Sequence, residues 1–178
     1  DPRDLHSFPT RRSSDLPQEM REKFGEDVVA RETFVMHDCT DEASLVYVGQ
    51  LPSGGELWVN RYAVETDLLV SEGFIEPHFF AGFSGGRKSV LPGIAGRRTV
   101  LANHCAAFIA DPLARAGNLE GNPIHRDMLS AARQVKLAFI LNVTLNPDKS
   151  IAAAFRSEES RVGKEWRSRG LPDNCKKK

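Results

Sequence analysis

Two histidines and a lysine stand around a glycine-dense stretch in the middle of the chain. Residues 76–104 read EPHFFAGFSGGRKSVLPGIAGRRTVLANH, with His78 near the start, Lys88 in the middle and His104 at the end. Glycines at positions 82, 85, 86, 93 and 96 allow backbone N–H groups to converge on a bound anion. Imidazoles ligate metals and move protons near neutral pH, and an amine binds phosphate or attacks a carbonyl carbon. These residue types favour a cofactor site over a packing element.

Gly85, Gly86 and Arg87 extend this candidate site. The two glycines come directly before Arg87 and Lys88, so we expect their backbone and the two cations to contact the cofactor together. Arg87, Arg97 and Arg98 either hold a phosphate or carboxylate or belong to a solvated face. The residue types leave these two alternatives open.

One competing interpretation concerns residues 82–89, GFSGGRKS. They are similar to the phosphate-binding loop of nucleotide hydrolases, in which the lysine follows the last glycine directly. Here Arg87 stands between Gly86 and Lys88, and no apolar strand ending in Asp follows. Nucleotide binding is therefore the weaker alternative.

The run PHFFAGFSGGRKSVLPGIAG, followed by Asn103 and His104, resembles the signature of the nickel-dependent lactate racemase family. The resemblance to these 2-hydroxyacid racemases and epimerases extends over residues 17–155. It implies that His78 is a general acid/base at the substrate hydroxyl and that His104 is the protein ligand of nickel. It also implies that Lys88 forms a covalent, amide-type link to a nickel-pincer pyridinium mononucleotide, although some relatives hold this cofactor non-covalently.

The reaction that the resemblance implies is inversion at C2 of a small 2-hydroxyacid. Proton abstraction from the hydroxyl would accompany reversible hydride transfer to the cofactor. The family also has a second catalytic histidine, an N-terminal substrate motif and a C-terminal domain, none of which has a counterpart here. The chain is therefore interpreted as part of an N-terminal catalytic domain, inactive without the C-terminal domain of the same parent chain. A non-catalytic homologue that binds the metal or cofactor is the alternative, and the identity of the 2-hydroxyacid stays open.

Both ends of the chain differ from the middle. Residues 8–16, FPTRRSSDL, resemble the translation of a sequencing-adapter oligonucleotide, and residues 156–170 resemble the reverse-strand translation of a similar adapter. We therefore interpret residues 1–16 and 156–178 as artefacts, with charged disordered tails as the alternative. Residues 17–155 then form the domain.

Composition excludes several classes of protein. The chain has 24 basic and 24 acidic residues, of which 13 basic and 17 acidic fall within residues 17–155. This acidic excess argues against a nucleic-acid partner. Three cysteines provide no disulfide framework, and no apolar run approaches the length of a membrane span. We expect a cytoplasmic protein without a membrane partner.

The periodicity of the apolar residues predicts an α/β fold, in which strands and helices alternate. Gly25 is expected to break the first helix, and Asn122 to cap the last, with Pro123 in its first turn. The strand over 67–75 is expected to be buried and to deliver His78 at its carboxyl end. His37 and Asp38 are expected to be structural, His125 to be exposed or capping, and Asn103 to orient His104. Helices are predicted over residues 17–31, 97–110 and 123–135, and strands over 45–48, 56–61, 67–75, 136–145 and 150–155. The turn residues PSGG at 52–55 are expected to join the first two strands, and NPDK at 146–149 the last two.

Overall fold

A three-stranded sheet forms the base of the computed structural model, which describes residues 6–7 and 17–158. Its strands are β5 (Leu69–Phe74), β8 (Leu137–Leu145) and β9 (Ile151–Glu158), adjacent in that order. β5 and β8 are parallel, whereas β8 and β9 form an antiparallel hairpin. The predicted α/β class and the predicted hairpin over residues 136–155 are both confirmed.

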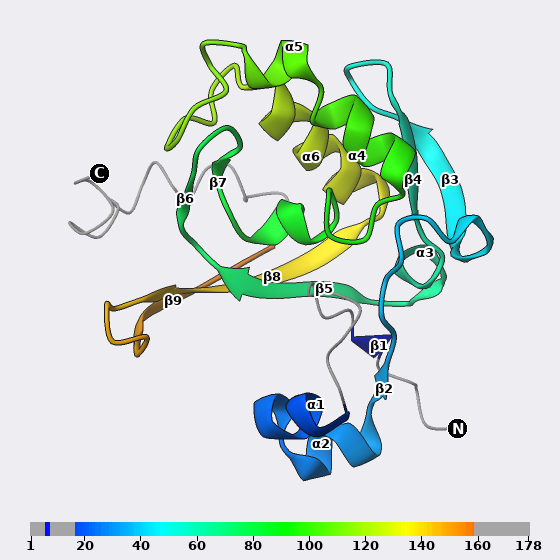
Figure 1. Ribbon diagram of the computed structural model, residues 1–178, viewed down its shortest axis with the longest axis vertical. Helices are drawn as coiled ribbons and strands as arrows, with labels where there is room; N and C mark the ends of the chain where they lie inside the picture. Colours follow the sequence, from blue (N-terminus) through cyan, green and yellow to red (C-terminus); the bar gives the residue numbers. More distant parts are fainter. Residues whose placement is uncertain (1–5, 8–16, 159–178) are drawn as a thin grey trace.

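Three helices connect the parallel strands and lie over one face of the sheet (Figure 1). They are α4 (Arg97–Asn103), α5 (Ala106–Ile109) and α6 (Pro123–Gln134). Two parallel neighbouring strands need such a crossover. α6 begins as predicted, because Asn122 accepts hydrogen bonds from two backbone N–H groups and Pro123 occupies the first turn.

The hydrophobic core lies between α6, the sheet and the segment after β7. Burial of these side chains is the main stabilising contribution to this arrangement. The large apolar side chains that are fully buried in this core are Leu57, Val59, Val90, Leu91, Ile124 and Met128. Leu57 and Val59 come from a neighbouring hairpin.

The other face of the sheet carries apolar side chains that the described residues leave exposed. Val70 and Phe74 of β5 are each 55% exposed, and Leu141 of β8 is 43% exposed. The register places Glu72 opposite Leu141, so these residues share one face. The prediction of a buried strand over 67–75 is therefore wrong for this face, because the described helices cover only the opposite one.

A second sheet is the antiparallel hairpin of β3 (Leu45–Gln50) and β4 (Glu56–Asn60), as predicted. A single helical turn flanks each strand at the open end of the hairpin: η1 (Glu42–Ser44) precedes β3, and α3 (Tyr62–Glu65) follows β4. The hairpin is held to α4 by Thr99, whose hydroxyl accepts from Trp58 N at 2.9 Å and donates to Glu56 O at 2.9 Å.

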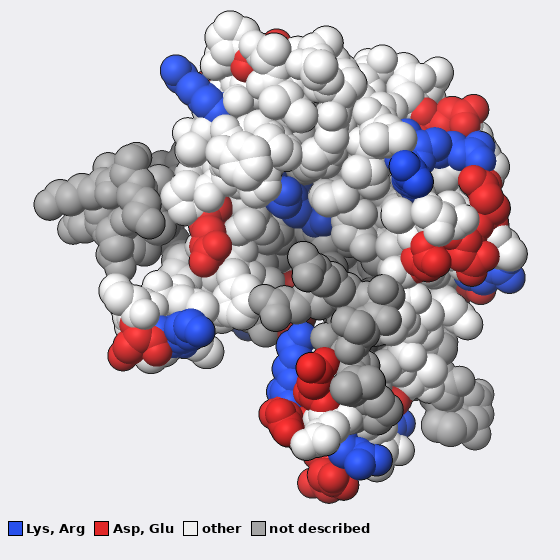
Figure 2. Space-filling model, viewed as in Figure 1, with Lys and Arg blue, Asp and Glu red and all other residues white. Residues whose placement is uncertain are grey.

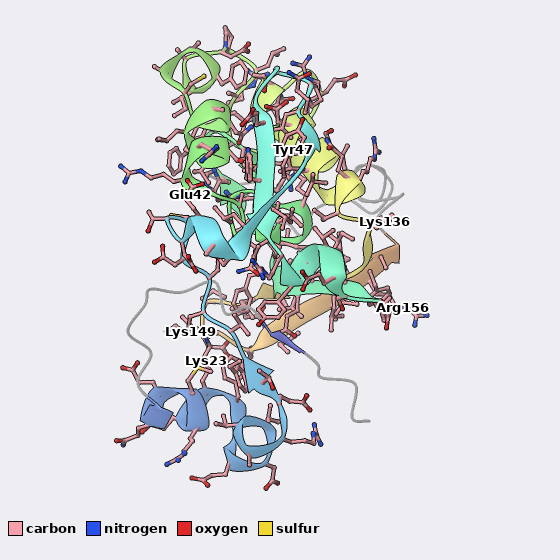
Figure 3. All side chains as sticks on the ribbon, turned by 90° about the vertical axis from the view of Figure 1, so that its right-hand side faces the viewer. Lys23, Glu42, Tyr47, Lys136, Lys149 and Arg156 are labelled. Atoms are coloured by element: carbon pink, nitrogen blue, oxygen red, sulfur yellow. The ribbon has the colours of Figure 1, made fainter. Side chains whose placement is uncertain are left out.

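The N-terminal helices α1 (Pro17–Phe24) and α2 (Glu26–Arg31) lie apart from the main body (Figure 3). Gly25 separates them with a positive φ of 86°, which confirms the predicted break. β2 (Thr33–Phe34) follows and pairs in parallel with β1 (His6–Ser7).

The glycine-dense stretch leaves β5 and folds into three short elements. These are β6 (Pro77–His78), β7 (Gly82–Phe83) and the 3-10 turn η2 (Gly86–Ser89). β6 and β7 form a small antiparallel hairpin, with His78 opposite Gly82. The strand over 67–75 thus delivers His78 beyond its carboxyl end, as predicted.

The predicted helix over 97–110 is wrong in its middle. α4 ends at Asn103, and His104 follows as its C-cap with φ −96° and ψ 33°. Cys105 is extended, with ψ 157°, before α5 begins. The buried Asn103 side chain bonds to α6, so the chain turns there, and His104 does not lie within a continuous helical face.

Candidate active site

The three predicted site residues meet around one aromatic ring, that of Phe80. The Phe80 ring centre lies 4.5 Å from that of His78 and 5.2 Å from that of His104, and both pairs are edge-to-face. Lys88 Nζ lies 6.0 Å from the Phe80 ring centre, within the range of a cation–π contact. β6, η2 and the end of α4 therefore bring together residues that are up to 26 positions apart in sequence.

His78 is half-buried and held on both sides. Its ring stacks on Phe79 at 4.8 Å with an interplanar angle of 11°, and its Nδ1 accepts a hydrogen bond from Ala81 N at 3.3 Å. Burial, and then the charges of Lys88, His104 and Arg87, lower the pKa of His78 to about 4. The ring is therefore neutral at pH 7, and the Ala81 bond places its proton on Nε2.

Lys88 is partly buried in η2. Burial, and then the neighbouring charge of Arg87, lower the pKa of Lys88 to about 8. Within residues 17–158, none of the ion pairs includes Lys88. A substantial fraction of this amine is unprotonated near pH 8, which is the form that attacks electrophilic carbon.

His104 presents an imidazole with an unsatisfied nitrogen. Its backbone N donates to Val100 O at 2.8 Å, but its ring Nδ1 is buried and has no hydrogen-bond partner. Burial and the charge of Lys88 lower the pKa of His104. A neutral ring is the form that ligates a metal ion.

Arg87 is buried, and its side chain bonds to backbone groups. It is 2% exposed, and its Nη2 donates to Ala81 O at 2.9 Å and to Phe83 O at 3.1 Å. Burial lowers the pKa of Arg87 to about 10. These bonds show that Arg87 holds the β6–β7 hairpin, while its contact with a cofactor stays a prediction.

Arg98 belongs to a solvated surface, which is the second of the two alternatives that its residue type left open. It is exposed and forms an ion pair with Glu42, with an Nη2–Oε2 distance of 2.6 Å. Arg97 is also exposed. Figure 2 shows charged side chains of both signs gathered on this side of the molecule, over the region of β3 and β4.

The glycines at 85 and 86 are required by packing against the sheet. Both have positive φ, and a Cβ on Gly86 would lie 3.0 Å from Ile140 Cδ1. Gly86 N donates to the Asn142 side chain at 3.4 Å. Other N–H groups of the stretch also bond within the protein, namely those of Ser84, Lys88, Val90, Leu91 and Gly93. The expected phosphate-binding role of Gly85 and Gly86 stays a prediction, with fewer available donors than the sequence suggested.

The structure does not have the arrangement that the nucleotide-hydrolase alternative requires. That motif needs a loop that opens directly into a helix whose N-terminus faces the phosphates. Here the lysine lies inside the four-residue turn η2, and Gly93 N donates a hydrogen bond to Lys88 O at 3.1 Å.

Residues outside the predicted set also build the site. Phe80 was visible only as an aromatic neighbour of His78, and no periodicity indicated that it would touch three functional side chains. Asn103 does not orient the His104 ring; its Nδ2 donates to Ile124 O at 3.3 Å and to Asp127 Oδ2 at 3.4 Å. His37 is structural as predicted, because its Nε2 lies 3.0 Å from Ala95 O.

The prediction of an exposed His125 is wrong. Its side chain is 8% exposed, and its Nδ1 has no hydrogen-bond partner. Burial, and then the charges of Arg87 and Arg133, lower the pKa of His125 to about 3. The first turn of α6 packs inward, since Pro123 and Ile124 are buried as well, and so is Asn122 before them.

The face that carries these residues is hollowed at its centre. Figure 2 shows Lys or Arg atoms inside the hollow, where Figure 1 draws the segment after β7. No cluster of three or more His, Cys, Asp or Glu side chains suited to a metal ion occurs among the described residues. Every described helix is too short or too polar to span a lipid bilayer.

The structure is an α/β domain that carries a His–Lys–His cluster, and comparison with known proteins gives its family. Residues 10–117 match the family described as the lactate racemase N-terminal domain. The match covers more than half of the chain, so the chain belongs to this family. The resemblance that residues 76–104 carry is thereby confirmed at the level of the family.

Two curated lactate racemases are similar to the chain. It is 58% identical over 145 residues to that of Thermoanaerobacterium thermosaccharolyticum and 59% identical over 141 residues to that of Lactiplantibacillus plantarum. These alignments cover 82% and 79% of this chain but only 34% and 33% of the relatives. The chain thus spans about a third of the length of the curated relatives it matches.

Solved structures give the same result. The lactate racemase apoprotein from T. thermosaccharolyticum superposes with a TM-score of 0.81 at 56% identity, covering 84% of this chain and 36% of that one. A crystal structure of a protein from Thermotoga maritima superposes with a TM-score of 0.72 at 26% identity, covering 87% and 42%.

Proposed function

We propose that this chain supplies part of the active site of a lactate-type 2-hydroxyacid racemase, an isomerase. The observation that carries the proposal is the meeting of His78, Lys88 and His104 around Phe80. Two relatives at 58% and 59% identity are lactate racemases, which supports the same class of reaction.

The residues of the cluster fit a nickel-bearing pyridinium mononucleotide. His104 would ligate nickel, because its imidazole is neutral and one ring nitrogen has no protein partner. Lys88 would hold the mononucleotide, either by charge or by a covalent amide-type link, for which its lowered pKa is suited. When bound, this cofactor would supply a site that accepts and returns hydride.

His78 would handle the proton of the substrate C2 hydroxyl. A neutral imidazole accepts such a proton, and the stack on Phe79 with the edge of Phe80 fixes the plane of the ring. Nε2 is the nitrogen left to face the substrate, because Nδ1 is bonded to Ala81 N. Base action at Nε2 requires the ring proton to move to Nδ1, so the Ala81 bond must loosen when substrate binds.

We expect the 178-residue chain alone not to racemise lactate. A racemase must serve both enantiomers, and the family resemblance assigns the second histidine and further substrate contacts to segments that residues 17–155 do not contain. The test is therefore a chimera, in which residues 17–155 replace the matching segment of the T. thermosaccharolyticum lactate racemase. Its 58% identity to the relative and the TM-score of 0.81 support grafting.

The chimera should interconvert the lactate enantiomers, as followed by chiral chromatography. His78→Gln should lower the rate by about 100-fold or more while nickel content is retained, because general acid–base catalysis contributes at least this much. His104→Gln should lose nickel, and His37→Gln, outside the site, should change neither quantity. A chimera that folds but stays inactive, or that tolerates His78→Gln, contradicts the proposal.

The same chimera separates the alternatives. Nickel bound in a His104-dependent manner without any turnover would favour a non-catalytic cofactor-binding homologue. A panel of lactate, malate-like, aryl-lactate and sugar-acid substrates would address specificity. That specificity depends in part on pocket contacts outside this chain.

A further inference from the structure

The position of the Phe80 ring depends on contacts from outside its own hairpin. Phe80 lies in the three-residue connection between β6 and β7, each of which is only two residues long. The carbonyls of residues 80, 81 and 82 each accept a hydrogen bond from another segment. The donors are Asn122 Nδ2 at 2.8 Å, Arg87 Nη2 at 2.9 Å and Gly117 N at 2.9 Å, respectively.

Asn122 uses both ends of its side-chain amide. Its Oδ1 accepts from Ile124 N at 3.0 Å and His125 N at 3.2 Å, which caps α6. Its Nδ2 donates to Phe80 O at 2.8 Å and to Asn118 O at 3.1 Å. The residue is 1% exposed. Because backbone N–H groups only donate and carbonyls only accept, one amide orientation alone satisfies all four partners.

Capping by itself does not require asparagine at this position. Serine and aspartate cap helices about equally well, because a cap needs only an oxygen acceptor. Neither offers N–H donors on the opposite side, toward Phe80 and Asn118. The choice of asparagine therefore points to its second pair of bonds.

We propose that Asn122 is a positioning residue of the site: it fixes the Phe80 backbone and, through the Phe80 ring, the spacing of His78, Lys88 and His104. The ring is the common neighbour of all three side chains. A displaced ring would change the placement of each relative to the others. The effect on catalysis rests on the proposed function, whereas the positioning itself does not.

The positioning is tested by NMR on the 178-residue chain. Asn122→Asp and Asn122→Ser keep an oxygen cap for α6 but remove the donors to Phe80. Far-UV circular dichroism should stay unchanged, while nuclear Overhauser contacts from the Phe80 ring to the His78 and His104 rings should fall by at least half. Asn118→Asp is the matched control: it removes two side-chain bonds in the same loop, to Leu113 O and Glu120 O, but none to Phe80. It should leave those contacts intact.

Unchanged ring contacts in both Asn122 variants would overturn the proposal. Unfolding of both variants, with Asn118→Asp still folded, would overturn it too, because Asn122 would then determine folding rather than site geometry. In the chimera, Asn122→Asp should lower kcat by about tenfold or more with a smaller change in KM, since small misplacements of catalytic groups cost this much. An unsubstituted chimera without activity would count against the proposed function, and the NMR contacts would still decide the positioning.

Discussion

At the scale of single residues, the site combines four basic groups whose ionised forms are disfavoured. Burial lowers the pKa values of His78, Lys88, His104 and Arg87, and the charges of Lys88 and Arg87 lower those of their neighbours further. Such shifts cluster at functional sites because catalysis needs groups whose pKa values differ from those in water. Here they produce two neutral imidazoles and an amine that is partly neutral.

Lys88 should react with electrophiles at a lower pH than an ordinary lysine. With a pKa of about 8, roughly half of the amine is neutral at pH 8, against less than about 1% for an unperturbed lysine. Acetylation by acetic anhydride, followed by mass spectrometry from pH 6 to 11, should give a rate profile for Lys88 with a midpoint near pH 8. The exposed Lys136 is the accessible comparison. Identical profiles for the two lysines would contradict the assigned environment.

The sequence predicted which residues would meet, but not what holds them together. Their types and spacing indicated His78, Lys88 and His104, because these residue types are the ones that carry proton, amine and metal chemistry. The roles of Phe80 and Asn122 come from contacts across 42 positions of sequence, which no local pattern encodes. The burial of His125 was missed for the same reason, since Arg87, one of the groups near it, comes from η2 and not from α6.

At the scale of elements, turn and capping residues were the reliable signals. Gly25, residues 52–55 and Asn122 marked a helix break, a hairpin and a helix start, all as the structure has them. Each acts through local backbone chemistry. The end of α4 at Asn103 was not predictable in this way, because it coincides with a buried side-chain bond to α6, which no local pattern reveals.

The β6–β7 hairpin should be intolerant of a side chain at Gly82. This glycine has φ +81°, and a Cβ there would overlap the Asn118 carbonyl and lie 2.8 Å from Leu119 Cδ2. Gly82→Ala should therefore lower the free energy of unfolding by about 3 kcal/mol, combining backbone strain and overpacking. Urea unfolding followed by circular dichroism measures this change.

Gly54 provides the matched control for that substitution. It has φ +90°, but a Cβ there would meet nothing within 4 Å. Gly54→Ala should cost only about 1 kcal/mol, from backbone strain alone. Equal losses for the two variants would show that the contact between the hairpin and residues 118–119 contributes little.

At the scale of the whole molecule, the described chain covers one face of its sheet and leaves the other apolar. Parallel strands are usually covered on both faces, and β5 and β8 are parallel. Val70, Phe74 and Leu141 are the side chains that such a cover would bury. These positions are apolar in the sequence, but the hydrophobic pattern does not reveal whether the chain also provides the layer that would cover them.

The buried histidines should make the stability of the folded chain depend on pH. His125 has an unfolded pKa of about 6.5 and a folded pKa of about 3, so the unfolded state binds more protons between these values. Its contribution is fully present above about pH 6.5 and is lost as the pH falls toward 3. His78 acts in the same direction down to about pH 4. Each can lower the free energy of unfolding by up to about 1.4 kcal/mol per pH unit.

Urea unfolding at intervals from pH 7.5 to 4.5 measures this slope, and His125→Gln separates the contribution of one histidine. The variant should lose stability less steeply on acidification than the unsubstituted chain, because glutamine does not titrate. The two curves should therefore converge toward low pH, whatever the variant loses in packing at pH 7.5. Parallel curves would mean that His125 gains a proton in the folded state as readily as in the unfolded one. The assignment of His125 to a buried position, in a first turn of α6 that packs against the site, would then be wrong.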